Sequence, residues 1–293
     1  MFRKAEALHP AKHKSLRIAA IDGYGFASKT LTVPIVFSEM ADIAREYPLL
    51  FQKNTDTPVA LMGAKAGVNA YVAADGRWLA TYKPARIATY PFALVPIPDK
   101  PAEMALVVDM AADQIGPSIG DALFDTNGQP SPALKARLDV LKKMKEQEAT
   151  TARMVRQIRA AGLLVERAIR VSQKDDKDRQ ITGLEFINEK ALNTMAHEDF
   201  AKLRDGGVLP LIYAHLLSMS NLRQGPIAGT LGHAGNKMPE MTDQIDVDGI
   251  LQRHKSSLPE QDLAPTQDGN VVNIAADTGD FDLSAFVKPE KSD

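Results

Sequence analysis

Four side chains capable of acid–base or hydrogen-bond chemistry lie close together in residues 206–222, the most apolar long segment of the chain. They are Tyr213, His215, Ser218 and Asn221. Histidine titrates nearest to neutral pH, so His215 is the natural candidate for a general base. On a helix, His215 and Ser218 share one face, whereas Tyr213 points to another. Ser218 and Asn221 lie one turn apart.

Two interpretations of this segment remain open. Pro210 comes early, where a helix tolerates a missing N–H, and apolar residues then recur at helical spacing. Buried polar groups are usually hydrogen-bonded structural groups, which favours a core helix whose polar side chains are satisfied by neighbours. In the alternative, Tyr213, His215 and Asn221 line a pocket.

A second set of candidate groups lies in the aromatic-rich segment 76–92, which contains the only tryptophan of the chain. Aromatic side chains at strand corners are commonly core packing, but they also line pockets. A pocket between this segment and the His215 helix would suit an enzyme or a small-molecule-binding protein. Five further candidate residues of this pocket lie within the segment, and a sixth, Glu39, precedes it. The five are Arg77, Trp78, Tyr82, Arg86 and Tyr90.

The composition restricts the classes of chemistry. The chain has 293 residues, 44% hydrophobic and 25% charged, which is ordinary for a globular protein. It contains no cysteine, so disulfides, thiolate catalysis and cysteine-bound metal centres are excluded. The net charge of −2 provides no overall basic field, so we expect no nucleic-acid partner.

Familiar cofactor and metal motifs do not appear. Gly23 and Gly25 resemble the start of a dinucleotide fingerprint, but the third glycine is missing, so they are interpreted as turn glycines. The run from Asp125 to Gly128 lacks the spacing and the closing glutamate of a calcium loop. No P-loop, nucleophile elbow or His-x-x-x-His is present. We therefore expect no cofactor and no bound metal.

The hydrophobic patterns predict an α+β fold with a mixed or largely antiparallel sheet. Ser131 and Pro132 begin the longest predicted helix, which ends at about Gly162. Ser38 is predicted to cap a helix over 39–46, and Asn188 one over 189–194. A helical cluster is expected over 189–222. Strands are predicted at 15–20, 31–37, 49–51, 58–62, 69–72, 92–97, 104–109, 163–172 and 180–188.

The charge pattern predicts three regions: a flexible arm over 1–14, a globular domain over 15–224, and a linker with an acidic disordered tail over 225–293. Between Glu240 and Asp293, twelve acidic residues stand against four Lys and Arg, a net charge of −8. The rest of the chain therefore carries +6. Within the tail, Phe281 and Phe286 form an aromatic-acidic island that could dock on a protein partner.

The predicted location is cytoplasmic. The first residues are basic, but no apolar signal region follows, and no apolar run reaches about 18 residues, so no transmembrane segment is expected. Surface association would then require a non-standard export route.

Several short motifs, in order, resemble the SapC family of bacterial proteins over about residues 15–224. The opening motif runs from Leu31-Thr-Val-Pro to Glu39, followed by Tyr47-Pro and Phe51. Further matching pieces are Val59–Gly63, Asn69, Asp75–Trp78, Tyr82 with Pro84 and Ala85, Tyr90–Phe92, Gly120–Phe124, Asn127-Gly128, Gly183-Leu184 and Tyr213–Ser218.

The resemblance implies an association with surface-layer or outer-membrane systems, and it brings no catalytic residues with it. We therefore hypothesise a soluble, non-catalytic accessory or binding protein for a cell-envelope or surface-layer system. The alternative is an enzyme or small-molecule-binding protein that uses the pocket around His215 and the aromatic segment 77–92.

Overall fold

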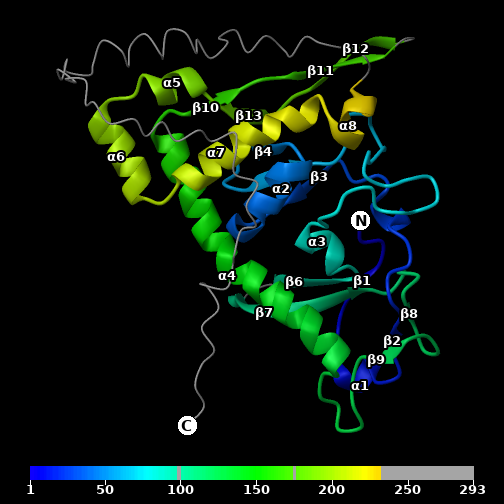
Figure 1. Ribbon diagram of the computed structural model, residues 1–293. Helices are drawn as coiled ribbons and strands as arrows, with labels where there is room; N and C mark the ends of the chain where they lie inside the picture. Colours follow the sequence, from blue (N-terminus) through cyan, green and yellow to red (C-terminus); the bar gives the residue numbers. More distant parts are fainter. Residues whose placement is uncertain (98–99, 174–175, 232–293) are drawn as a thin grey trace, which may run out of the picture. The chain divides into compact units, whose positions relative to one another are not determined.

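The structure, a computed structural model, describes residues 1–97, 100–173 and 176–231 (Figure 1). For 101–102, 170–173 and 176–179 it describes the backbone only. The predicted disordered tail lies outside the described residues from 232 onward. The described chain is α+β, and its strand pairs are antiparallel, as the sequence predicted.

The largest described sheet has five strands in the order β10-β13-β4-β5-β3. The neighbouring strands β4 and β5 are joined by a turn in which Asn54 adopts φ 61°, a left-handed conformation that asparagine tolerates. Pro34 lies in β3 at the edge of the sheet, where its missing N–H breaks no ladder. The strands are β3 (Thr32–Pro34), β4 (Leu49–Gln52), β5 (Pro58–Leu61), β10 (Leu164–Glu166) and β13 (Leu184–Ile187).

Three smaller sheets accompany it, with orders β1-β7-β6, β8-β2-β9 and β11-β12. Their strands are β1 (Ala5–Ala7), β2 (Arg17–Ile18), β6 (Phe92–Ile97), β7 (Lys100–Asp109), β8 (Ile115–Gly116), β9 (Asp121–Ala122), β11 (Ile169–Gln173) and β12 (Asp176–Ile181).

The long helix α4 (Pro132–Ala160) confirms the sequence prediction. The Ser131 side chain accepts the Leu134 N–H at 3.3 Å, and Gly162, with φ 70°, follows its end. The helix packs against both hydrophobic clusters of the described chain. Leu134 and Leu141 belong to the one built on β6, β7 and the β2 region, and Met154 and Ile158 to the one around the five-stranded sheet.

The remaining helical elements are short. They are α1 (Pro10–His13), η1 (Gly25–Ala27), η2 (Phe37–Glu39), α2 (Met40–Glu46), α3 (Ala85–Ala88), α5 (Glu189–Asn193), α6 (His197–Asp205), α7 (Leu209–Ser218), η3 (Met219–Leu222) and α8 (Gly225–Thr230). Asn188 caps α5 by accepting the Ala191 N–H at 3.1 Å, as predicted. Helix α7 packs against α2, β4 and β13, and Figure 1 shows it in yellow beside them.

Two region boundaries differ from the sequence expectation. Ala5–Ala7 forms β1 and pairs with β7, so the expected flexible arm over 1–14 is part of the fold. The Asp109 carboxylate binds this segment by accepting hydrogen bonds from the backbone N–H groups of Arg3 at 2.9 Å and Lys4 at 2.8 Å. At the other boundary, Gly225–Thr230 forms α8 with Ile227 fully buried, where a linker was expected.

Three local predictions were also wrong. Ser38 does not cap the helix over 39–46, because η2 leads into α2 and two α4 side chains, Thr151 and Gln147, accept the N–H groups of Phe37 and Ser38. The strand expected at 69–72 is a turn region with one isolated bridge to Trp78. The run 163–172 divides into β10 and β11, which join different sheets.

Candidate functional site

His215 lies on the buried face of α7 with both ring nitrogens hydrogen-bonded to backbone groups. Its side chain is 1% exposed and lies between the rings of Phe51 and Phe186. Nε2 accepts the Ile187 N–H at 3.1 Å, and Nδ1 lies 2.7 Å from the Leu49 carbonyl oxygen. The imidazole therefore joins α7 to β13 and β4. Burial lowers the pKa of His215 to about 4, so the ring is neutral at neutral pH.

Ser218 and Asn221, further along the chain, also hydrogen-bond to backbone groups in the core. The Ser218 hydroxyl accepts the Leu49 N–H at 2.9 Å and donates to the His215 carbonyl at 2.7 Å. The Asn221 amide donates to the carbonyl oxygens of Ala44 at 2.9 Å and Tyr47 at 3.1 Å. These bonds satisfy the backbone where α2 passes into β4, a connection that would otherwise carry unpaired groups into the core.

Tyr213 is separated from the other polar groups of α7. Its side chain is 46% exposed, and Leu217, one turn along the same face, is 72% exposed. The structure thus brings His215, Ser218 and Asn221 together around the α2–β4 connection and places Tyr213 on the outer face, as the helical spacing predicted.

Glu39 and Tyr82 meet directly. The Glu39 carboxylate, 4% exposed, accepts the Tyr82 hydroxyl at 2.9 Å, the Ala85 N–H at 2.7 Å and the Val36 N–H at 3.2 Å. Burial, followed by the negative charge of Glu39, raises the pKa of Tyr82 well above its ordinary value. The carboxylate fixes the aromatic segment against the start of α2.

Trp78 belongs to an aromatic cluster with a polar centre. Its indole N–H donates to the Tyr47 hydroxyl at 2.9 Å, and that hydroxyl donates to the Tyr82 carbonyl. Tyr71 lies beside Tyr47, with ring centroids 4.4 Å apart. Glu46 accepts the N–H groups of Thr81 and Tyr82, both at 2.7 Å. Burial acts to raise the pKa of Glu46, but these hydrogen bonds outweigh it and hold the pKa below its usual value.

The other three candidates lie in different surroundings. Arg77 is exposed and pairs with Asp75 at 2.7 Å within its own turn. Tyr90 is fully buried and donates its hydroxyl to Asp109 at 2.9 Å, and burial raises the pKa of Tyr90 to about 12. Arg86 pairs with Glu148 of α4 at 2.7 Å. None of the three contacts His215 through a described hydrogen bond.

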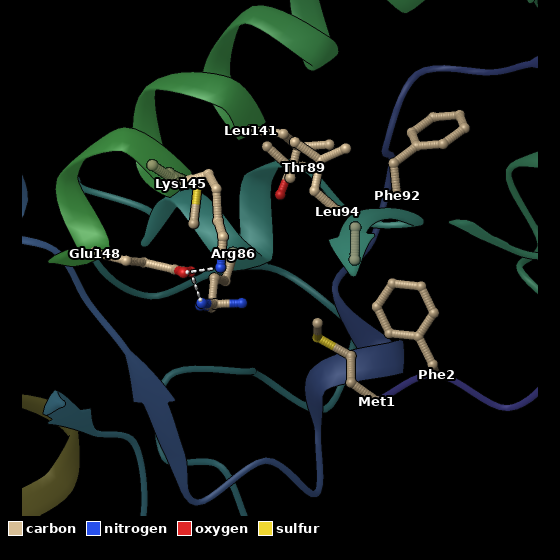
Figure 2. Close-up of a pocket in the computed structure, with 11 residues that line it drawn as sticks. Met1, Phe2, Arg86, Thr89, Phe92, Leu94, Leu141, Lys145 and Glu148 are labelled. Atoms are coloured by element: carbon tan, nitrogen blue, oxygen red, sulfur yellow. Dashed lines mark hydrogen bonds and ion pairs between the residues drawn. The ribbon is translucent and has the colours of Figure 1, made fainter. Parts of the chain in front are cut away.

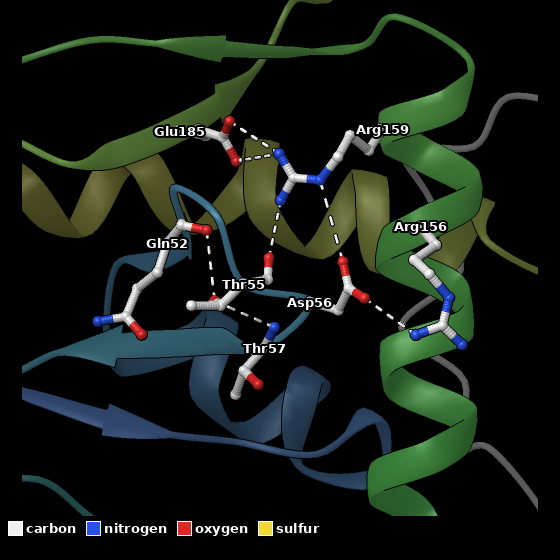
Figure 3. A network of polar contacts seen from close by, with 7 residues as sticks. All are labelled: Gln52, Thr55, Asp56, Thr57, Arg156, Arg159 and Glu185. Atoms are coloured by element: carbon white, nitrogen blue, oxygen red, sulfur yellow. Dashed lines mark hydrogen bonds and ion pairs between the residues drawn. The ribbon is translucent and has the colours of Figure 1, made fainter.

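A polar network that sequence reasoning missed joins α4 to the five-stranded sheet (Figure 3). Arg159 Nη1 reaches both oxygens of Glu185, at 2.8 and 2.7 Å, and Nη2 donates to the Thr55 carbonyl at 2.8 Å. Arg156 pairs with Asp56 at 2.9 Å. Arg159 is one of many basic residues along this helix, and the charge pattern gives no sign that it faces the β4–β5 turn.

A small cavity of about 60 Å³ lies where α4, α3, β6 and the first two residues meet (Figure 2). Arg86 is the one predicted candidate residue that lines it. Lys145 and Glu148 of α4 line it as well, and sequence reasoning did not single them out as a site. This cavity is therefore not the pocket that was expected around His215.

Two findings concern ion and membrane sites. In residues 1–97, 100–173 and 176–231, no group of three or more His, Asp or Glu side chains is arranged to hold a metal ion. Within the same residues, no helix combines the length and apolarity needed to cross a lipid bilayer.

Comparison with known proteins gives one match. The family model described as SapC matches residues 8–224, which is well over half of the chain. No curated protein and no solved structure matches it.

Proposed function

This chain belongs to the SapC family, and on that premise we propose that it is a non-catalytic accessory or binding protein for a cell-envelope or surface-layer system. The cysteine-free composition supports a cytoplasmic site of action in this proposal.

The observation that supports a binding role over catalysis is the use of the polar candidate groups in backbone hydrogen bonds. A general base needs a free nitrogen or oxygen within reach of a substrate proton. His215 instead has both ring nitrogens bonded inside the core. Glu39 accepts three hydrogen bonds from the chain itself. These groups stabilise a body that can present binding surfaces.

The partner in this proposal is a protein, reached through the aromatic-acidic island around Phe281 and Phe286. These two residues lie outside the described part of the chain. The support is their sequence context: two aromatic side chains in an otherwise polar, acidic stretch. Aromatic anchors of this kind contribute disproportionately to protein–protein binding.

Chemical cross-linking of the full-length chain, followed by capture from separated envelope and soluble fractions, tests this proposal. We expect an envelope-fraction protein to co-purify with the native chain and to be lost from the double variant Phe281→Ser and Phe286→Ser. The matched control, Val271→Ser with Val272→Ser, should retain it.

If the two double variants capture the same protein equally well, the proposal that a partner binds through Phe281 and Phe286 is refuted. Turnover of a substrate that is lost in His215→Asn at unchanged melting temperature would overturn the non-catalytic role and favour an enzyme.

A further inference from the structure

The cavity in Figure 2 brings together two cations and one carboxylate. Glu148 accepts from Arg86 Nη2 and from Lys145 Nζ, both at 2.7 Å. The three side chains are each about one-third to two-fifths exposed, so the group is partly shielded from water. Its net charge is +1, because a single carboxylate faces two cations. One positive charge is left without a partner in this group.

Arg86 also has unused hydrogen-bonding capacity. Guanidinium carries five N–H donors. In the described part of the chain, one nitrogen of Arg86 meets an acceptor, and its Nε–H is buried with none. The Nε–H has no accessible surface, so a bound molecule would meet the Nη groups instead, and Nη1 has no acceptor among the described residues.

Apart from Thr89, the rest of the cavity lining is apolar, and the cavity is small. Phe92 and Leu94 of β6 and Leu141 and Met144 of α4 form its walls, with Met1 and Phe2 beside them. A water-sized probe needs roughly 10–15 Å³. The volume of about 60 Å³ therefore admits only a few non-hydrogen atoms. A ligand that fits must combine one negative charge with a short apolar part.

We propose that this cavity binds a small aliphatic monocarboxylate. The ligand carboxylate accepts hydrogen bonds from Arg86 and Lys145, and its short hydrocarbon part lies against Leu94, Leu141 and Met144. Planar carboxylate groups match the guanidinium fork, and the apolar wall selects against fully hydrated inorganic anions. This site is independent of the proposed protein partner, since it uses none of the residues of that proposal.

Isothermal titration calorimetry of the full chain with sodium butyrate tests the proposal. Butyramide serves as the neutral isostere and inorganic phosphate as the charged, non-apolar probe. We expect saturable binding of butyrate with a roughly millimolar dissociation constant, as suits a ligand of few atoms. Butyramide and phosphate should bind much more weakly.

Three variants locate the site. Arg86→Gln should weaken butyrate binding by about tenfold or more, because it removes a charged hydrogen-bond donor. Arg153→Gln, the matched change on the exposed face of α4, should leave binding unchanged. Ala93→Leu, which adds volume to a lining residue, should abolish binding with Arg86 intact. Glu148→Gln should tighten binding severalfold, because it removes the competing carboxylate.

Several results would overturn the proposal. These are the absence of saturable butyrate binding, equal affinity for butyramide or phosphate, and equal effects of Arg86→Gln and Arg153→Gln. If Arg86→Gln fails to fold, Glu148→Gln decides: unchanged or weaker butyrate binding by that variant would also refute the site.

Discussion

The His215 imidazole donates from Nδ1 to the Leu49 carbonyl oxygen at 2.7 Å, across 166 residues of sequence. The direction of this bond follows from the other nitrogen. Because Nε2 accepts the Ile187 N–H, the ring proton of the neutral form must be on Nδ1. A protonated ring would put two donors on this site, with the Ile187 N–H facing one of them.

The stability of the protein should therefore fall as the pH is lowered from about 6.5 to about 4. Burial lowers the folded-state pKa of His215 to about 4 from an ordinary value of 6.5. Between these values the unfolded chain binds a proton that the folded chain does not. This histidine contributes a loss of about 3 kcal/mol across the window and no further loss below it. Urea titrations at a series of pH values measure it.

His215→Asn is the control for this pH dependence. Carboxylates and other histidines also titrate in the window, but they are common to both proteins. The stability difference between native and variant chains should therefore shrink on acidification. Parallel stability curves between pH 7 and pH 4 would show that His215 is not the titrating group.

His215→Ala should destabilise the protein far more than Tyr213→Ala. The histidine change leaves a cavity and two unpaired backbone groups, which together cost about 3 kcal/mol or more. Tyr213 is about half exposed, so its loss should cost much less, about 1 kcal/mol. Thermal melting of the two variants measures the difference. Similar melting temperatures would contradict the structural role of His215.

Tyr90 and Asp109 should form a stabilising buried pair. Tyr90→Phe removes the hydrogen bond to the carboxylate and should cost about 2 kcal/mol, while Tyr90→Ala also opens a cavity and should cost about 3 kcal/mol or more. Lys142→Ala on the exposed face of α4 should stay within about 0.5 kcal/mol of neutral. A Tyr90→Ala loss equal to that of Lys142→Ala in denaturant titration would refute the burial of this side chain.

Arg159 should be intolerant of lysine, whereas neighbouring Arg156 should accept it. Lysine cannot reach Glu185 and the Thr55 carbonyl at once, because it lacks the planar fork of guanidinium. Arg159→Lys should cost about 1–3 kcal/mol, since Glu185 is largely buried. Arg156→Lys keeps the charge of a partly exposed ion pair that does not need the guanidinium fork, and it should cost less than about 1 kcal/mol. Equal losses would contradict the network in Figure 3.

A chain ending at Leu231 should melt within a few degrees of the full chain, whereas one ending at Gln224 should melt lower. The shorter chain loses α8, whose Ile227 is fully buried, and burying an isoleucine is worth about 1.5–3 kcal/mol. Calorimetry of the two truncations measures the difference. A large loss already at Leu231 would show that residues beyond it stabilise the body.

Elements with local signals could be predicted from the sequence. Ser131 before Pro132 marks the start of α4, and Asn188 marks that of α5, because a cap and its N–H groups lie within four residues. The spacing on α7 also separated His215 from Tyr213. The burial of His215 among satisfied partners agrees with the core-helix interpretation.

Features made by residues far apart could not be predicted. The N–H groups of Phe37 and Ser38 are satisfied by α4 side chains more than a hundred residues away, so the local motif pointed wrongly to Ser38. The same reason hid the cavity, because Arg86 and Glu148 are 62 residues apart and meet only in the folded chain. The charge pattern of α4 alone does not reveal which cations face inward.

Helix α4 has a mechanical consequence for the whole described body. Its 29 residues span about 43 Å, and its two ends enter different hydrophobic clusters, through Leu134 and Leu141 and through Met154 and Ile158. A rigid rod anchored at both ends transmits strain, so loosening one cluster should reduce amide-exchange protection in the other. We expect the two clusters to open as one cooperative unit, because the same helix contributes core residues to both.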